Sequence, residues 1–282
     1  MNILGLVEQG ARTLTAHSDS PRLDAELLLA QVLHLPRSSL IARHESSVSD
    51  DAEQSYGRLL QRRAAGVPVA YLLGVREFWS LKLKVTPAVL VPRPESEILV
   101  EEALKHMDAH ASGRLLDLGT GSGAIALALA GERPSWRITA VDISEDALAV
   151  AAENGRALNC PNVEWRLGNW FEAVAQMRFE VIVGNPPYVA ATDPALAKLI
   201  DEPALALSSG PTGLEALAAI IARASGFLGP AGVLLLEHGH DQAGAVVELF
   251  QRHGFSDIRT HMDLSGTPRV TRGVLHSQRG TS

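Results

Sequence analysis

Hydrophobic and polar residues follow two different rhythms along this chain. In the N-terminal part, apolar positions recur at helical spacing, and Pro36 interrupts one such run. Ser49 and the acidic residues after it suit a helix start, and Arg62 and Arg63 suit a helix end, because these charges complement the helix dipole. We therefore predict that residues 1–66 are entirely helical.

The segment 67–94 alternates apolar and polar positions between prolines, which predicts a β-hairpin linker. From residue 95 onward, short apolar runs alternate with helical periodicity. The expected strands are 114–118, 137–142, 163–167, 179–184, 232–237, 255–260 and 269–276, and the expected helices are 95–109, 123–131, 145–158, 213–228 and 241–253. This alternation predicts an α/β domain over 95–282, with a mostly parallel sheet covered by helices on both faces.

Composition narrows the class of protein. The 282 residues are 46% hydrophobic, which is enough for a substantial core. The net charge of −7 gives no sign of the basic face that nucleic-acid binders usually carry, although a local patch is compatible with it. Cys160 is the single cysteine, so the sequence holds no disulfide framework and no cysteine-based zinc site. Without a signal-peptide pattern or an apolar run of ~18 residues, we expect a cytoplasmic protein.

A glycine-rich turn follows the first strand expected after residue 95, in the stretch RLLDLGTGSGAIALALA. Gly119, Gly121 and Gly123 let the backbone approach a ligand closely, and Asp117 lies at the end of the strand. The spacing G-x-G-x-G differs from the G-x-G-x-x-G of dinucleotide proteins, and a carboxylate beside it suits a cationic or zwitterionic ligand better than a pyrophosphate. A tight strand–helix turn without a ligand is the competing interpretation.

Asp142 ends the next expected strand, where a carboxylate can accept hydrogen bonds from both hydroxyls of a ribose. The same position fits NAD, so Asp142 indicates a nucleoside rather than one particular cofactor. A helix N-cap is the alternative role, but Ser144 already suits it.

The stretch VIVGNPPYVA ends a strand-like run in a stiff turn. Two adjacent prolines cannot continue a sheet ladder, since neither has an N–H to donate. We expect this strand beside the first one, which brings Asn185 next to the glycine turn, at the edge where ligands bind. The Asn185 side-chain oxygen and the Pro186 carbonyl can accept both N–H bonds of an –NH₂ group, and Tyr188 offers a ring face for a flat group or a cation. These groups indicate methyl transfer from S-adenosyl-L-methionine to a planar –NH₂, promoted by positioning and by acceptors for developing charge.

Taken together, the Asp117–Gly123 turn, Asp142 and NPPY resemble the class I S-adenosylmethionine-dependent methyltransferases that modify amino groups. Within these, the chain is most similar to the peptide chain release factor glutamine methyltransferase family. The stretches that carry the resemblance are GVPVAYLLGVREFW, VPRPESEILVE, GNWFE, EPALALSSGPTGLEAL, LLLEHGHDQ and RVTRGVL. The resemblance implies a Rossmann-like domain with a seven-stranded sheet and one antiparallel strand, after a small helical bundle that grips the protein substrate and a β-hairpin linker.

The resemblance also implies an activity and a site. The family methylates the side-chain amide nitrogen of the glutamine in the Gly-Gly-Gln motif of peptide chain release factors, and S-adenosyl-L-homocysteine is the by-product. The implied cofactor-site residues are Gly119, Thr120, Gly121, Ser122, Gly123, Asp142, Trp170 and Asn185. The implied substrate-site residues are Asn185, Pro186, Pro187 and Tyr188, of which Asn185, Pro186 and Tyr188 are the catalytic candidates. We expect release factors as partners, and neither a metal, a membrane nor direct contact with nucleic acid.

Some residues depart from the family's pattern. Asn169 stands where many relatives have Asp, which can reverse a hydrogen bond to the adenine amino group, and Glu180 and His238 are also atypical. His238 and His240 share one face of a strand, but two imidazoles without a third ligand make a poor metal site. We expect both to be loop-facing polar residues.

Other polar and aromatic residues have structural interpretations. Glu237 ends the apolar run GVLLLE and is expected to be a buried, hydrogen-bonded carboxylate rather than an acid catalyst. Arg93 and Glu95 suit an ion pair in the linker, and in the resembling family this segment flanks the cofactor pocket. Trp79 and Trp165 are expected in the core or the hairpin.

Three other functions stay open. A ribosomal-protein glutamine methyltransferase would use the same chemistry on another protein. A nucleic-acid adenine methyltransferase would keep NPPY but should add a basic recognition surface, which the sequence does not display. A non-enzymatic nucleotide-binding module would leave the NPPY turn without a role.

Overall fold

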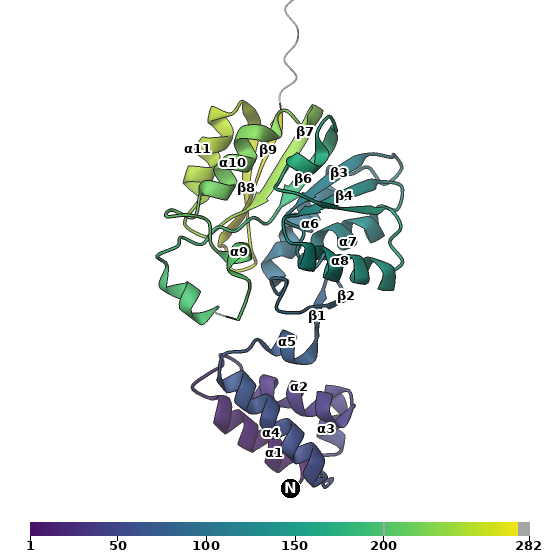
Figure 1. The fold of residues 1–282 in the computed structure, drawn as a ribbon, viewed down its shortest axis with the longest axis vertical. Coiled ribbons are helices and arrows are strands. Elements are labelled where there is room, and N and C mark those ends of the chain that lie inside the picture. The colour runs from purple at the N-terminus through teal and green to yellow at the C-terminus, as the bar shows by residue number, and fades with distance from the viewer. Residues whose placement is uncertain (200, 276–282) are drawn as a thin grey trace, which may run out of the picture. The chain divides into compact units, whose positions relative to one another are not determined.

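The chain folds into two compact units (Figure 1), as described by a computed structural model that covers residues 1–199 and 201–275. The units are Met1–Val75 with Lys198–Asp201, and Arg76–Ala197 with the chain from Glu202 onward. Each unit has hydrophobic core clusters of its own. The three-part division into 1–66, 67–94 and 95–282 stays a prediction.

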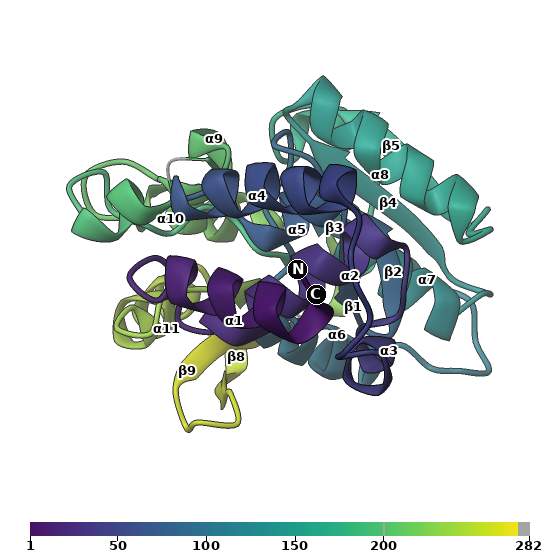
Figure 2. The same cartoon turned by 90° about the horizontal axis from the view of Figure 1, so that it is seen from below.

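The first unit is a helical bundle. Its helices are α1 (Ile3–Leu14), α2 (Pro21–Leu33), α3 (Arg37–Ala42), α4 (Asp50–Ala64) and α5 (Val69–Leu73). Helices α1, α2 and α4 pack against one another (Figure 2). Tyr56 of α4 lies between them, with its hydroxyl 3.3 Å from Leu6 O of α1 and 3.2 Å from Ala25 O of α2. A Cβ at Gly10 would collide with that hydroxyl, so only glycine fits there. The helical prediction is confirmed, whereas α5 lies in the segment expected to be the linker.

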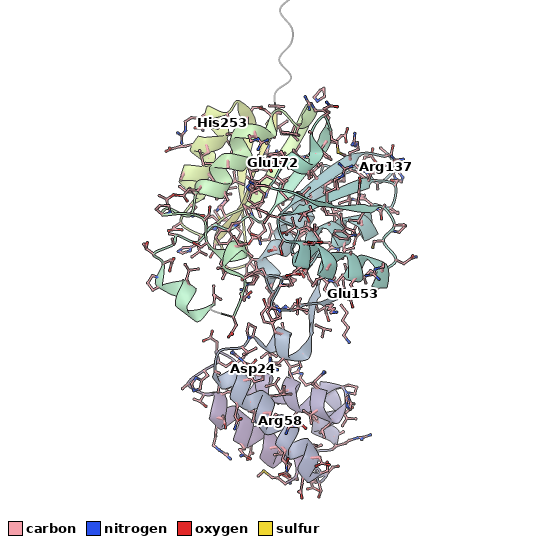
Figure 3. All side chains as sticks on the ribbon, viewed as in Figure 1. Asp24, Arg58, Arg137, Glu153, Glu172 and His253 are labelled. Atoms are coloured by element: carbon pink, nitrogen blue, oxygen red, sulfur yellow. The ribbon has the colours of Figure 1, made fainter. Side chains whose placement is uncertain are left out.

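Arg63 has a role beyond the helix dipole. It lies at the end of α4, and its Nε donates to Asp24 Oδ2 of α2 at 2.8 Å, with both side chains largely buried. Figure 3 shows Asp24 inside the helical unit. Removing one partner of such a pair leaves a buried charge uncompensated, so this contact ties α4 to α2.

A two-stranded hairpin follows, formed by β1 (Val75–Phe78) and β2 (Leu81–Lys84). Its turn residues, Trp79 and Ser80, have φ angles of 51° and 59°, the geometry that a two-residue hairpin requires. Two acceptors hold this uncommon conformation, because Trp79 N donates to Glu97 Oε1 at 2.8 Å and Trp79 Nε1 to Glu132 Oε1 at 2.9 Å. Trp79 therefore belongs to the hairpin, as expected.

The second unit is built on a seven-stranded sheet. Its strands are β3 (Arg114–Leu118), β4 (Arg137–Asp142), β5 (Val163–Leu167), β6 (Phe179–Gly184), β7 (Leu228–Glu237), β8 (Phe255–Met262) and β9 (Pro268–Leu275). The strand order is β5-β4-β3-β6-β7-β9-β8. Strand β9 is antiparallel to both of its neighbours, β7 and β8, and so runs opposite to the other strands of this sheet. This confirms the predicted Rossmann-like sheet, and residue 276 of the last expected strand lies outside the described residues.

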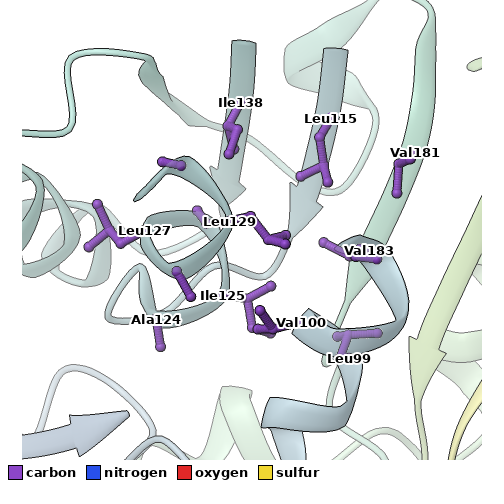
Figure 4. Packing of buried hydrophobic residues seen from close by; sticks show 14 of the residues in the cluster. Leu99, Val100, Leu115, Ala124, Ile125, Leu127, Leu129, Ile138, Val181 and Val183 are labelled. Atoms are coloured by element: carbon purple, nitrogen blue, oxygen red, sulfur yellow. The ribbon is translucent and has the colours of Figure 1, made fainter. Parts of the chain in front are cut away.

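Helices cover both faces of the sheet. The longer ones are α6 (Glu97–Leu104), α7 (Ala124–Glu132), α8 (Glu145–Ala157), α10 (Glu215–Ala224) and α11 (Ala243–Arg252), with the short α9 (Ala204–Leu207) and the 3₁₀ turns η1 (Pro94–Ser96), η2 (Glu172–Val174) and η3 (Pro194–Lys198). Helices α6 to α8 pack on one face and α10 and α11 on the other. Figure 4 shows Leu115, Val181 and Val183 of two adjacent strands packing toward Leu99 and Val100 of α6.

Two helices end several residues earlier than predicted. The helix expected over 95–109 ends at Leu104, and the helix expected over 213–228 ends at Ala224. Both finish in tight turns with bonds between residues three apart, such as Phe227 N to Ala224 O at 2.9 Å. Among the described residues, no helix is both long and apolar enough to span a membrane.

Candidate active site

The site lies where three neighbouring parallel strands end. Strand β3 pairs with β4 on one side and with β6 on the other. Asp142 ends β4 and Asn185 follows β6, so the two residues flank the glycine turn. A cavity of about 310 Å³ opens at this edge. The lining residues that the sequence predicted are Gly119, Thr120, Gly121, Ser122, Asp142, Trp170, Asn185 and Pro187. The expected position of Asn185 is confirmed, because its backbone oxygen lies 4.0 Å from where a Gly119 Cβ would be.

The three glycines of the turn have positive φ, but they serve two purposes. Gly119 and Gly121, at 73° and 55°, line the cavity, and a Cβ on Gly121 would meet nothing within 4 Å. Gly123, at 83°, is not among the lining residues, and a Cβ there would lie 3.0 Å from Trp165 Cη2. Gly123 therefore allows the start of α7 to pack against Trp165, which contacts the core as expected.

Asp142 braces the turn and faces the cavity. Its Oδ2 accepts from Gly121 N at 2.8 Å and its Oδ1 from Ser144 N at 2.9 Å. The Ser144 hydroxyl accepts from Ala147 N at 3.2 Å, which confirms Ser144 as the cap of α8. Since each oxygen of a carboxylate has more than one acceptor position, Asp142 keeps capacity for a ligand.

Asp117 lies fully buried behind the glycine turn. The pKa of its carboxyl is raised to about 7, chiefly by burial and also by the nearby Asp142 charge, while the Thr120 hydroxyl opposes this shift by donating to Asp117 Oδ2 at 2.6 Å. Asp117 does not line the cavity, so it supports the turn from within rather than contacting a ligand.

The Asn185–Tyr188 turn presents only part of itself to the cavity. Asn185 and Pro187 line it, whereas Pro186 and Tyr188 do not. The Tyr188 hydroxyl donates to Glu237 Oε1 at 3.2 Å, and burial raises the pKa of Tyr188 well above its usual value. A ring face for a substrate remains a prediction for Tyr188, since its hydroxyl is directed into the core.

Residues distant in sequence support this turn. Asn185 Nδ2 donates to Ser96 Oγ at 3.2 Å, and Gln242 Nε2 donates to Tyr188 O at 2.9 Å. A Cβ on Gly213, whose φ is 77°, would collide with Tyr188 O. Sequence reasoning did not assign Ser96, Gln242 or Gly213 to the site, because nothing in their local pattern indicates contacts so far along the chain.

The linker and the end of β7 confirm one sequence prediction and overturn two others. Glu237 is buried and hydrogen-bonded, as expected. The linker ion pair expected between Arg93 and Glu95 is wrong: Arg93, which lines the cavity, pairs with the buried Glu202 at 2.5 Å. The expectation of a loop-facing His238 is also wrong. Its side chain is fully buried, with Nδ1 2.9 Å from Gly239 O and Nε2 2.9 Å from Thr271 Oγ1. Burial lowers the pKa of His238.

The atypical residues have separate positions. Asn169 is exposed and lines the cavity beside Trp170, and Glu180 accepts from Arg114 N at 2.7 Å on the surface. Cys160 is half-buried. Within residues 1–199 and 201–275, no group of three or more His, Cys, Asp or Glu side chains is arranged to hold a metal.

The cavity fits S-adenosylmethionine by its chemistry. The open space beside Gly121 allows close approach of a ligand to the backbone, Asp142 supplies a carboxylate for ribose hydroxyls, and Trp170 and Ile143 supply apolar surface for a base. These residues come from the ends of β3, β4 and β5, which is the usual ligand edge of such a sheet.

Known proteins match both units. A family model described as PrmC N-terminal domain matches residues 5–74, and one described as Methyltransferase small domain matches residues 95–243. A release factor glutamine methyltransferase from Coxiella burnetii is 45% identical over 260 residues, covering 92% of this chain and 94% of that protein. One from Salmonella typhimurium is 48% identical over 258 residues, covering 91% and 93%.

A crystal structure of a methyltransferase from Pyrococcus furiosus shares the fold, with a TM-score of 0.54 and 20% identity, covering 79% of this chain and 98% of that one. The sequence matches, the glycine turn and the NPPY turn all indicate the same family of methyltransferases. The chain belongs to the release factor glutamine methyltransferase family.

Proposed function

We propose that this chain transfers a methyl group from S-adenosylmethionine to the side-chain amide nitrogen of the glutamine in the Gly-Gly-Gln motif of peptide chain release factors, and that S-adenosylhomocysteine is the by-product. The observation that carries the proposal is that Gly119–Ser122 of the glycine turn and Asn185 and Pro187 of the NPPY turn line one cavity. The names of the relatives, release factor glutamine methyltransferase, support the substrate.

The residues divide into two groups. Gly119 to Ser122, Asp142 and Trp170 would hold the cofactor, which when bound supplies an electrophilic methyl group on its sulfonium sulfur. Asn185 Oδ1 takes no hydrogen bond from the residues that the structure describes, and we assign it to one N–H of the substrate amide. We assign the other N–H to the carbonyl of Pro186, the next residue in the turn, although Pro186 is not among the residues that line the cavity.

Two fixed acceptors promote transfer to an amide, which is a weak nucleophile because its lone pair is delocalised. They hold the nitrogen where it can attack, so that entropy is lost on binding rather than in the reaction step. They also stabilise the positive charge that develops on nitrogen as the new C–N bond forms. The nitrogen then releases one proton to water and remains an amide.

The experiment that tests this function maps the methyl group. Labelled S-adenosylmethionine is incubated with the protein and, in separate reactions, with purified release factor, a ribosomal protein fraction and DNA. We expect label on the Gly-Gly-Gln glutamine alone, and none on a release factor in which alanine replaces that glutamine. Label on a ribosomal protein or on adenine would replace the proposed substrate by one of its two rivals.

The helical unit is proposed as the part that grips the protein substrate. A large substrate can use binding energy from a remote surface to help the chemical step. Deleting residues 1–66 should leave cofactor binding intact, since the second unit has its own core, and should sharply lower methylation of intact release factor. Methylation at the wild-type rate by the truncated chain would exclude this role.

No metal is proposed for the reaction. The groups assigned to it are hydrogen-bond acceptors on a rigid turn, and they complete the step without a Lewis acid. Activity should survive exhaustive EDTA treatment, and a loss that zinc or magnesium restores would overturn this proposal.

A further inference from the structure

A chain of hydrogen bonds runs from the cavity into the core behind the NPPY turn. Asn185 Nδ2 donates to Ser96 Oγ at 3.2 Å, and Ser96 Oγ donates to Glu237 Oε2 at 2.6 Å. The Tyr188 hydroxyl donates to the other oxygen, Glu237 Oε1, at 3.2 Å. Ser96 and Glu237 are 4% and 1% exposed, so bulk water does not compete for these bonds.

The carboxylate sets the direction of every bond in this chain. An ionised carboxylate only accepts, so Ser96 directs its single hydroxyl proton to Glu237. The Ser96 oxygen then offers lone pairs to its other neighbour and must face a donor. The only donor on the Asn185 side chain is its –NH₂ group, and the amide oxygen is therefore turned away from Ser96.

We infer that Ser96 and Glu237 are positioning residues that fix the orientation of the Asn185 side-chain amide, and thereby make Asn185 an acceptor for the substrate –NH₂. The inference rests on the proposed function. In the opposite orientation Asn185 would present N–H donors to an –NH₂ group, and two donors facing each other leave both unsatisfied. Glu237 acts twice, because the same carboxylate anchors Tyr188 at the far end of the turn.

The groups around Glu237 make this orientation depend on pH. The pKa of Glu237 is raised to about 7, chiefly by burial and also by the charge of Glu95, against the opposing effect of the Ser96 and Tyr188 hydroxyls and the Arg269 cation. A protonated carboxyl can donate to Ser96, which frees the serine proton for the asparagine amide. The preference for one amide orientation is then lost.

The test compares two substitutions of Ser96 in the full-length protein, with release factor as the substrate. Ser96→Ala removes the hydroxyl, and Ser96→Thr keeps it. With prebound S-adenosylmethionine at a pH of about 8, we expect the single-turnover rate to fall roughly 10-fold for Ala, the loss expected for about one hydrogen bond, and to stay near wild type for Thr. Cofactor affinity, measured by calorimetry, should be unchanged in both.

A double-mutant cycle separates positioning from a merely structural role. Because Ser96 acts through Asn185, Ser96→Ala should lower the rate no further in a protein that already carries Asn185→Ala. Ser209→Ala is the control: Ser209 is also buried and its hydroxyl accepts from Ala216 N at 2.8 Å, but unlike Ser96 it does not line the cavity. The control should lose stability without a comparable loss of rate.

The outcomes distinguish this inference from the function on which it rests. If the wild-type protein does not methylate release factor, the proposed function falls and the inference falls with it. If the wild type is active but Ser96→Ala is equally fast, or if Ser96→Ala and Asn185→Ala act additively, the inference is overturned while the function stands. The wild type provides a second check that needs no variant. Its single-turnover rate should decline as the pH drops below about 7, and a flat profile would contradict the role of ionised Glu237.

Discussion

The two turns that meet at the cavity are held in different ways. The Gly119–Gly123 turn is held by the end of the adjacent strand β4: its N–H groups donate to the backbone oxygen of Val141 and to the side chain of Asp142, the last residue of that strand. The Asn185–Tyr188 turn contains two prolines, which have no N–H to donate, and it is held by side chains from distant segments, chiefly Ser96 and Glu237. The glycine turn is therefore set by two adjacent strands, β3 and β4, whereas the acceptor site on the proline turn depends on segments from both ends of the domain.

The largest effect is expected from a substitution in the Asn185–Tyr188 turn, the acceptor turn. Asn185→Ala removes one preorganised partner at the reacting group and should lower the single-turnover rate by roughly 100- to 1000-fold, or about 3–4 kcal/mol. Asn185→Asp keeps acceptor oxygens but places a negative charge beside the site of a sulfonium ligand, so we expect partial activity. Equal, near-wild-type rates for both variants would show that the NPPY turn is only structural.

The next largest effect is expected from a substitution of Asp142, which braces the Gly119–Gly123 turn, the cofactor turn. Asp142→Ala should weaken S-adenosylmethionine binding roughly 10- to 100-fold, because a hydrogen bond to a charged group contributes about 1.5–3 kcal/mol. The variant also loses the bond to Gly121 N, so its melting temperature serves as the control for folding. Calorimetry that gives the wild-type affinity would remove Asp142 from the cofactor site.

A buried carboxyl behind each turn predicts how stability depends on pH. Burial raises the pKa of both Asp117 and Glu237 to about 7, above their values in the unfolded chain. Between about pH 4 and pH 7 the folded state therefore keeps protons that the unfolded state releases, so the free energy of unfolding should fall as the pH rises, by up to about 1.4 kcal/mol per pH unit for each group. The free energy of unfolding, measured by urea titration at several pH values, should fall less steeply with pH in Glu237→Gln than in the wild type. The same dependence on pH in both proteins would contradict the raised pKa of Glu237.

The smallest expected effect sharpens the comparison at the far end of the NPPY turn. Gln242→Glu keeps the acceptor for Gly239 N but replaces the donor to Tyr188 O, which should cost about 1 kcal/mol and slow transfer by several-fold. Cofactor affinity should not change, because Gln242 supports only the acceptor turn. A change confined to cofactor affinity would show that Gln242 supports the cofactor turn rather than the acceptor turn.

The sequence predicts the sheet and the cofactor edge well because both depend on local pattern. Each apolar run forms the predicted strand, and Gly119, Gly121 and Asp142 lie at the strand ends that parallel-sheet topology requires. Motif spacing does not separate Gly123 from them, since its neighbour is Trp165, which comes from a strand much later in the chain.

The supports of the acceptor turn lie beyond what local pattern can predict. Ser96 and Glu237 are 141 residues apart in the sequence, and neither is marked as part of a pair. The expected ion pair between Arg93 and Glu95 fails for the same reason, because the actual partner, Glu202, is more than a hundred residues away. Hydrogen bonds and ion pairs between side chains far apart in the sequence depend on tertiary packing, so the hydrophobic periodicity of the sequence cannot predict them.

The division of labour between the two turns is tested most directly by measuring two quantities on the same pair of variants. Calorimetry gives the affinity for S-adenosylmethionine, and a single turnover with saturating, prebound cofactor gives the rate of methyl transfer to release factor. Asp142→Ala should lose affinity and keep most of its rate, whereas Asn185→Ala should keep affinity and lose its rate. If both variants lose the same quantity to a similar extent, the two turns form one binding site and the separate acceptor role of Asn185 is contradicted.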